Sequence, residues 1–277
     1  MSSIYYLNGK FVTADQASLP LKDLGIVRGY GVFDYLRTYN GKPFHLEEHV
    51  QRLARSAEQI YLQLPQPPAE IFEIVHETLA QNSYEEAGIR LVVTGGSSPN
   101  FFSPTGESSL AIMIEPAPTY PESYFTEGVK IITVKVTREY PTVKSLNYIG
   151  AIIAMKEADA AGAIEAVYLD ADNNLTEATR CNFVGVKGNT LITPPDNVLD
   201  GITRNVVLKL AAEEFNIEMR PIPYAEIETL DEAFITSSTK EVMPVTTIDE
   251  LTVGNGQPGH VTKRLHELFQ AYTAAYK

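Results

Sequence analysis

Two short segments of the chain carry groups that can bind an anion. Gly201-Ile202-Thr203-Arg204 opens an expected helix, where free backbone N–H groups, a threonine hydroxyl and the helix dipole can hold a phosphate. The alternative is an ordinary helix start capped by Asp200 or Thr203. Thr236-Ser237-Ser238-Thr239 follows an apolar run, and its hydroxyl groups can cradle an anion or simply form a turn.

A third group of residues can support covalent chemistry. Lys144 is followed by Tyr148 four residues later, and Glu177 lies further along the chain. A lysine that forms Schiff bases must be partly neutral near pH 7, which requires desolvation or a nearby positive charge. A carboxylate can keep the ring nitrogen of an electron-withdrawing cofactor protonated. A solvated surface lysine is the alternative, and these three residues alone do not exclude it.

The elements that must position these segments are short strands and helices. Asn8-Gly9 predicts a two-residue hairpin within Ile4–Val12, and prolines end a predicted helix at 47–62. We expect further helices at 69–82, 147–161, 203–215 and 260–276, and strands at 89–94, 110–114, 129–137, 166–169, 183–186, 190–193 and 232–236. This mixture predicts an α/β (α+β mixed) fold of two lobes, with a cofactor site in a cleft between them.

A proline-rich stretch marks the expected boundary between the lobes. Residues 116–122 include Pro116, Pro118 and Pro121, which would form a stiff connector. The prediction is therefore a smaller N-terminal lobe over 1–115 and a larger, cofactor-binding C-terminal lobe over 123–277.

Composition limits the classes of partner. With 22 basic and 35 acidic residues the net charge is −13, which disfavours binding to nucleic acid or anionic membranes. No apolar run reaches the roughly 20 residues of a membrane-spanning helix, and the N-terminus does not resemble a signal peptide. The single cysteine, Cys181, cannot form an internal disulfide, so we expect a cytoplasmic protein. Metal-binding clusters and nucleotide-binding loops are absent from the sequence, and no metal is expected.

Several segments carry a family resemblance, and they occur in family order over nearly the whole chain. The chain resembles the class IV (fold-type IV) pyridoxal-phosphate enzymes, which include branched-chain aminotransferases, D-amino acid aminotransferases and aminodeoxychorismate lyase. The matching segments are 29–34 (GYGVFD), 45–53 (HLEEHVQRL), 143–148 (VKSLNY), 175–178 (LTEA), 181–183 (CNF), 201–204 (GITR) and 234–245 (FITSSTKEVMPV).

The resemblance implies a role for each matched residue. Lys144 would be joined to pyridoxal 5′-phosphate and shuttle the proton between the substrate Cα and C4′, while Glu177 would pair with the ring nitrogen. The other cofactor contacts implied are Tyr148 to O3′, Leu199 to the ring face, and Arg52, Ile202, Thr203, Ser238 and Thr239 to the phosphate. The resemblance also implies a homodimer in which the N-terminal lobe reaches into the site of the partner.

The residues that would recognise the substrate depart from the family patterns. The C-terminal third is most similar to D-amino acid aminotransferases, yet the loop 94–102 lacks the arginine and histidine with which those enzymes bind the carboxylate. Gly88-Ile89-Arg90 keeps the arginine of a branched-chain motif and loses its tyrosine, and 34–37 (DYLR) is also altered. We therefore expect Arg28, Arg90 and Arg180 to bind substrate carboxylates. Surface ion pairs are the alternative for each arginine.

These observations predict a transaminase that acts on D-amino acids, with 2-oxoglutarate or pyruvate as acceptor. A branched-chain L-amino acid aminotransferase would share all the cofactor residues. Aminodeoxychorismate lyase activity is a further alternative, because it uses the same lysine. A non-catalytic binding protein of this fold would be expected to lose Lys144 or Glu177, and both are present.

Overall fold

The computed structural model describes residues 2–277, which form two compact units. The first unit extends to Pro118 and also includes residues 143–147 and 276–277; the second comprises 119–142 and 148–275. The expected connector 116–122 contains the point where the chain leaves the first unit. Residues 143–147 return to that unit, so that Lys144 belongs to it, whereas the sequence predicted one continuous lobe over 123–277.

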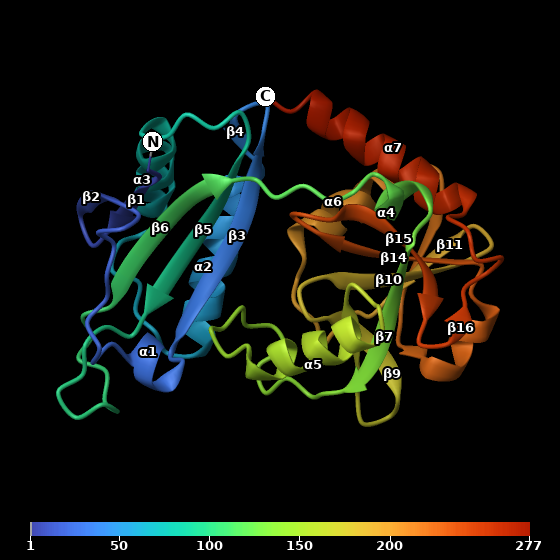
Figure 1. Ribbon diagram of the computed structural model, residues 1–277, viewed down its shortest axis with the longest axis horizontal. Coiled ribbons are helices and arrows are strands. Elements are labelled where there is room, and N and C mark those ends of the chain that lie inside the picture. Colours follow the sequence, from blue (N-terminus) through green and yellow to red (C-terminus); the bar gives the residue numbers. More distant parts are fainter. Residues whose placement is uncertain (1) are drawn as a thin grey trace. The chain divides into compact units, whose positions relative to one another are not determined.

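The first unit is built on a six-stranded antiparallel sheet of order β2-β1-β6-β5-β3-β4 (Figure 1). Its strands are β1 (Ile4–Leu7), β2 (Lys10–Thr13), β3 (Gly31–Tyr39), β4 (Lys42–Pro43), β5 (Ala87–Thr94) and β6 (Ser109–Pro116). Helices α2 (Leu46–Gln59) and α3 (Pro68–Ala80) cover one face, and the short α1 (Leu24–Arg28) precedes β3. Asn8 and Gly9 both have positive φ, which confirms the predicted hairpin.

Strand β3 divides its side chains between the two faces of this sheet. Val32 and Leu36 are fully buried in the core formed with α2 and α3. Because side chains alternate along a strand, Phe33 and Tyr35 lie on the opposite face. That face is the one on which the Lys144 side chain lies.

The second unit contains a sheet that closes on itself. The strand order is β12-β11-β10-β14-β15-β7-β8-β9-β13, β16 pairs with β15, and β9 also pairs with β10 through Glu177 and Asn182. The ring β10-β14-β15-β7-β8-β9 is therefore a small barrel, with an apolar interior. The strands are β7 (Val129–Lys135), β8 (Ala166–Leu169), β9 (Asn174–Ala178), β10 (Asn182–Lys187), β11 (Thr190–Thr193), β12 (Asn216–Met219), β13 (Ile222–Pro223), β14 (Glu232–Ser237), β15 (Glu241–Ile248) and β16 (Leu251–Thr252).

Four α-helices lie around this sheet: α4 (Ser123–Thr126), α5 (Ile149–Ala160), α6 (Ile202–Ala211) and α7 (His260–Ala274), with a 3-10 turn at Tyr224–Thr229. Helix α5 packs through the small residues Ala154 and Ala158 against Val134 and Tyr168. The mixed α/β fold predicted from the sequence is confirmed.

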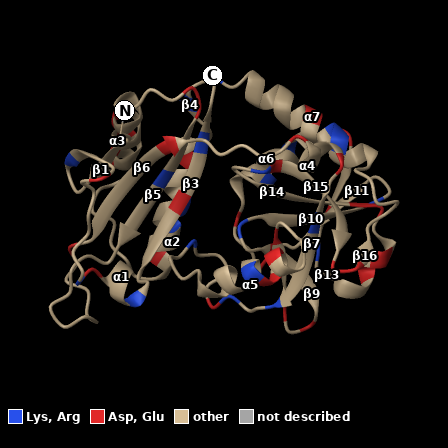
Figure 2. Ribbon diagram, in the orientation of Figure 1, with Lys and Arg blue, Asp and Glu red and all other residues tan. Residues whose placement is uncertain are grey.

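Charged residues are distributed over both units, and acidic ones outnumber basic ones (Figure 2). Within residues 2–277, no helix has the length and apolar character to cross a membrane. The same residues contain no group of three or more His, Cys, Asp or Glu side chains placed to hold a metal ion.

Candidate active site

Lys144 is held in the first unit by backbone pairing with β3. The Phe33 N–H donates to the Lys144 carbonyl at 2.9 Å, and the Leu146 N–H donates to the Gly31 carbonyl at 3.0 Å. The backbone N–H of Lys144 donates to Ser56 Oγ at 3.2 Å. A Cβ on Gly31 would lie 2.6 Å from both Leu146 Cδ1 and the Val93 carbonyl oxygen, so only glycine permits this close approach.

Two cationic side chains lie over the aromatic ring of Phe33. Lys144 Nζ lies 4.8 Å from the ring centroid, and the Arg90 guanidinium carbon lies 5.5 Å from it. Arg90 also lies over Tyr35, at 5.2 Å. Arg90 is exposed, and no carboxylate within residues 2–277 forms an ion pair with it. An amine and a free guanidinium therefore face the same region of the sheet.

Arg52 belongs to a buried charged cluster. Its Nε and NH2 atoms donate to the two oxygens of Asp34 at 2.9 and 2.7 Å, and His49 Nδ1 lies 2.7 Å from Asp34 Oδ1. Burial alone would raise the pKa of Asp34, but the Arg52 and His49 charges outweigh it and hold that pKa well below its usual range. Burial lowers the pKa of His49, against the opposing effect of Asp34. The cluster fixes the orientation of Arg52.

Glu177 is buried at the end of β9 in the second unit, and both of its oxygens have partners. Oε1 forms an ion pair with Arg138, and Oε2 accepts a hydrogen bond from the Leu199 N–H at 2.9 Å. Arg138 NH1 also donates to the Pro141 carbonyl at 2.8 Å. The carboxylate is thus oriented by a cation on one side and a backbone N–H on the other.

Asn182 connects the predicted cofactor residues of this unit. It pairs with Glu177 across β9–β10 and with Thr236 across β10–β14. Its Nδ2 donates to the Leu199 carbonyl at 2.9 Å. Glu177, the loop that carries Leu199 and the end of β14 are therefore fixed in one arrangement.

The start of α6 is an uncapped helix end. No side chain caps the first turn, and Gly201 lies directly against the Asn182 side chain, with no room for a Cβ. Ile202 and Thr203 are buried in this turn. Arg204 is also buried, and its Nε has no hydrogen-bond partner among residues 2–277. Free N–H groups, the helix dipole and a buried cation make this helix end suited to an anion.

The hydroxyl cluster after β14 forms a local turn. Ser237 Oγ accepts from the Lys240 N–H at 3.1 Å and lies 3.4 Å from Thr239 Oγ1. Ser238 and Thr239 are half-buried. The turn predicted as the simpler alternative is therefore present, and it leaves the predicted role of Ser238 and Thr239 in phosphate binding open.

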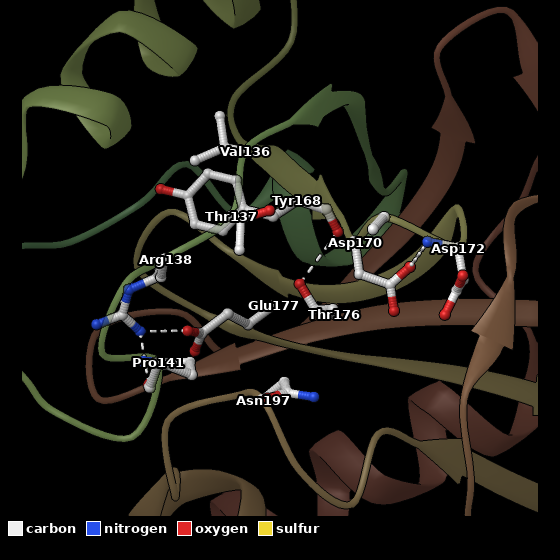
Figure 3. Close-up of a pocket in the computed structure, with 11 residues that line it drawn as sticks. Val136, Thr137, Arg138, Pro141, Tyr168, Asp170, Asp172, Thr176, Glu177 and Asn197 are labelled. Carbon is white, nitrogen blue, oxygen red and sulfur yellow. Dashed lines mark hydrogen bonds and ion pairs between the residues drawn. The ribbon is translucent and has the colours of Figure 1, made fainter.

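A cavity of about 280 Å³ opens beside the Glu177–Arg138 pair. Figure 3 shows Arg138 and Glu177 joined across it, with Tyr168 on its wall. Burial raises the pKa of the Tyr168 hydroxyl, which is therefore neutral. The cavity is lined by Val136, Thr137, Arg138, Pro141, Tyr168, Asp170, Ala171, Asp172, Thr176, Glu177 and Asn197.

The remaining predicted residues are divided between the units. Arg28 is exposed at the end of α1, where its NH1 donates to the Val27 carbonyl. Tyr148 is half-buried directly before α5. Arg180 lies after β9 and pairs with Glu165 at 3.5 Å. It does not line the cavity beside Glu177.

Sequence reasoning missed four residues that orient this chemistry: Asp34, His49, Arg138 and Asn182. The first two and Asn182 stand inside the matched segments, and the spacing of three between His49 and Arg52 places them on one helix face. Arg138 had no such signal, because it lies 39 residues from Glu177 along the chain.

Residues 31–248 match the family model described as amino-transferase class IV. A Methanocaldococcus jannaschii protein, named as a candidate branched-chain-amino-acid aminotransferase, is 38% identical over 275 residues, covering 96% of this chain and 94% of that protein. A D-alanine aminotransferase of Staphylococcus epidermidis is 34% identical over 284 residues, covering 98% of each chain.

Solved structures give a consistent result. The branched-chain amino acid aminotransferase of Escherichia coli has a TM-score of 0.92 and 26% identity, covering 100% of this chain and 95% of its own. A second branched-chain amino acid aminotransferase, from T.th., was solved with pyridoxamine 5′-phosphate. It has a TM-score of 0.91 and 25% identity, covering 100% of this chain and 96% of its own.

Proposed function

Because the chain belongs to the class IV aminotransferases, enzymes that use pyridoxal 5′-phosphate, we propose that it moves the amino group of a D-amino acid to a 2-oxo acid such as 2-oxoglutarate or pyruvate. The observation that carries the proposal is the shared position of Lys144 and Arg90 over the Phe33 ring. In the proposed reaction, Arg90 would bind the substrate carboxylate and the Lys144 amine would carry out the chemistry.

The residues present fit the cofactor. The uncapped start of α6, with Gly201 and the buried Arg204, suits a phosphate. Glu177 is an oriented, buried carboxylate that suits a protonated ring nitrogen. Ile202, Thr203, Ser238, Thr239 and Arg52 would complete the phosphate contacts, Leu199 would pack against the ring, and Tyr148 would bind O3′.

When bound, the cofactor supplies an electron sink that makes the Cα proton of the amino acid acidic. Lys144 Nζ would take that proton from the substrate Cα and return it at C4′. Glu177 holds a proton at the ring nitrogen, and Arg138 keeps the Glu177 carboxylate in place. Glu177 is buried, which keeps water away from its carboxylate.

Carboxylate recognition is assigned to Arg90 and Arg28 in the first unit and to Arg180 in the second. Arg90 and Arg28 have no ion-pair partner within residues 2–277, so their guanidinium groups are available to a substrate carboxylate. The preference for D-amino acids is supported by the D-alanine aminotransferases among the relatives.

The second candidate is a branched-chain L-amino acid aminotransferase. It is favoured by the name of the relative that is 38% identical and by Arg90, which occupies a branched-chain motif. Aminodeoxychorismate lyase activity shares the lysine and has no further support.

A half-reaction separates these candidates. The holoenzyme would be mixed with matched D- and L-forms of alanine, glutamate, leucine, isoleucine and valine, and the visible band of the bound cofactor, about 400–420 nm, would be followed. We expect the D-forms to bleach the band and the L-forms to leave it. Bleaching confined to L-leucine, L-isoleucine and L-valine would replace the D-specific proposal by the branched-chain one.

Substitution of the lysine tests the chemistry itself. Lys144→Ala should lose transamination and the visible band, and should still bind the cofactor weakly through its phosphate. Normal turnover in this variant would remove Lys144 from its role.

We also propose that the enzyme works as a homodimer. Helix α5 presents Ile149, Ile152 and Ile153 at 70%, 58% and 53% exposure, and their helical spacing places them on one face. Such an apolar stripe is suited to a second copy of the chain.

A further inference from the structure

A second cavity, of about 440 Å³, lies in the second unit, and Glu177 is not among the residues that line it. Arg180 and Lys240 supply its cationic wall, and Tyr120 and Tyr124 supply an aromatic one. The other lining residues are Pro121, Met155, Asp159, Ala163 and Ile164. The residues that line the cavity beside Glu177 do not take part in this one.

A buried carboxylate holds the two cations. Glu165 is fully buried, and its Oε2 lies 3.1 Å from Lys240 Nζ and 3.5 Å from Arg180 NH2. Thr179 donates its hydroxyl to the other oxygen of Glu165, and the Cys181 sulfur lies 3.6 Å from Oε2. Glu165 is therefore saturated by its neighbours and fixes where both cations lie.

The two cations of the cavity both stay charged. Burial alone would lower the pKa of Lys240, but the Glu165 carboxylate 3.1 Å away outweighs it and that pKa is raised, so the ammonium stays charged. Burial raises the pKa of Cys181, which keeps the thiol neutral. The two cations thus share one buried carboxylate, Glu165, whereas the acidic residue in the cavity lining, Asp159, is exposed and its charge is screened by solvent.

Both cations keep unused donors. The Arg180 guanidinium makes one weak contact, from NH2 to the Met155 sulfur at 3.8 Å, besides the pair with Glu165. The Lys240 ammonium uses Glu165 and Cys181, which leaves one of its three N–H groups. The Tyr120 and Tyr124 hydroxyls have no hydrogen-bond partner within residues 2–277, and the Lys240 ammonium lies 5.5 Å from the Tyr120 ring centroid.

We propose that this cavity binds the carboxylate of a small organic acid, with Arg180 and Lys240 as its donors and Glu165 as the positioning residue that holds them. Apolar and aromatic lining suits the carbon chain of such a molecule, and the guanidinium suits the carboxylate. Two sources share this chemistry: the amino or 2-oxo acid of the reaction, and a free carboxylate that binds apart from it. Carboxylate binding in this cavity does not depend on the proposed preference for D-amino acids, so it can be found even if the enzyme prefers L-amino acids.

The test is calorimetric titration of the holoenzyme with succinate, which carries no amino or oxo group. We expect saturable binding, weakened about tenfold or more in Arg180→Met, because one charge-assisted partner is lost. Arg180 is half-exposed, so this variant should fold. The matched control is Arg264→Met, which removes an arginine paired with Glu214 on the surface of the same unit. Succinate that does not bind the wild type, or that binds Arg180→Met as tightly as the wild type, overturns the proposal.

Lys240 is tested together with its buried partner. Lys240→Met alone would leave Glu165 buried without this cation, so it is combined with Glu165→Gln, which leaves the net charge of the site unchanged. This double variant should also bind succinate about tenfold more weakly, and unchanged affinity would exclude Lys240 as a donor.

Inhibition kinetics distinguish the two sources. Succinate that competes with the amino acid, with a raised KM in Arg180→Met, identifies the substrate carboxylate as the occupant. Inhibition that does not compete with the amino acid identifies a free carboxylate. Either pattern supports the cavity as a carboxylate site, provided that inhibition by succinate is lost in the double variant.

Discussion

At the scale of single residues, the carboxylate of Glu177 depends on a partner that does not itself enter the chemistry. Arg138 pairs with Glu177 and ties it to the turn at Pro141, three residues before Lys144 in the chain. The carboxylate is almost buried, with 6% of its side chain exposed, so that its orientation depends on this cation and on the Leu199 N–H.

Arg138→Leu should therefore leave the buried Glu177 carboxylate without its cation. A carboxylate that is no longer held in place orients less well toward the ring nitrogen, so turnover should fall. We expect a loss of about 1–3 kcal/mol in folding free energy, because Arg138 is partly solvated. Arg220→Leu, which breaks a surface pair with Glu226, is the control. Wild-type turnover in Arg138→Leu would contradict this role.

Arg90→Ala tests substrate recognition on the first unit. Loss of one arm of a charge-assisted pair should weaken binding of the amino acid and the 2-oxo acid by about 2 kcal/mol or more, which is roughly thirtyfold in KM. The affinity for the cofactor should not change, because Arg90 lies over Phe33 and Tyr35 and not among the phosphate-binding residues. If KM and kcat both stayed at wild-type values, Arg90 would be a surface residue only.

His49 gives the first unit a dependence on pH. Its pKa in the folded protein lies below that of the unfolded chain, so the unfolded chain binds more protons as the pH falls through about 6.5. Stability should therefore be greatest above that pH and fall on acidification, by up to about 1.4 kcal/mol per pH unit for this one group. The lowered pKa of Asp34 acts in the same direction at more acidic pH.

The measurement is thermal unfolding of the wild type and of His49→Gln between about pH 7.5 and pH 5.5. Glutamine can still donate to Asp34 but does not titrate, so the melting temperature of His49→Gln should fall less over this pH range than that of the wild type. Equal falls in the two proteins would show that His49 does not contribute.

At the scale of elements, the sequence predicted the longer helices, missed the short α1 and α4, and predicted somewhat more than half of the strands. The strands at 166–169 and 190–193 match β8 and β11 residue for residue, and the helix expected at 260–276 is α7. Among the missed strands, β15 has a clear physical reason. Pro244 lies inside β15, and proline normally argues against a strand; here β7 pairs with β15 only from Val245 onward.

The start of α6 provides a prediction at this scale. Gly201→Ala would place a Cβ on the Asn182 side chain, which also holds the Leu199 carbonyl. The helix start must then shift, so we expect a fall in cofactor affinity of about tenfold and a loss of about 1–3 kcal/mol in stability. Both are measured by cofactor titration and thermal unfolding.

Gly150→Ala is the matched control for this change. Gly150 lies in α5, where an added Cβ would meet only Val136 Cγ1 at an ordinary 3.6 Å. Because alanine favours a helix over glycine, this variant should be as stable as the wild type or slightly more stable. Equal cofactor affinity in the two variants would exclude a special role for Gly201.

At the scale of the whole molecule, the order of residues along the chain does not show which of the two units each residue belongs to. The proline-rich stretch 116–122 could be read as a boundary because of its composition, but nothing in the pattern predicted that 143–147 would return to the first unit. That return depends on Gly31, which allows Leu146 to approach β3, and such long-range contacts leave no local periodicity. The roles of Lys144 and Glu177 were inferred from the family resemblance, whereas the contacts of Arg138 and Asp34 could be identified only in the structure.

The last prediction concerns assembly. If two copies meet through α5, a charge on its exposed stripe should separate them, because a lysine buried at an apolar interface loses its hydration. We expect the wild type to sediment as a dimer and Ile152→Lys/Ile153→Lys to shift toward the 30.6 kDa monomer, with activity falling in parallel. Met219→Lys, which changes an exposed apolar residue on β12, should remain dimeric. A fully active monomeric wild type would rule out the dimer, and a dimeric double variant would move the interface away from α5.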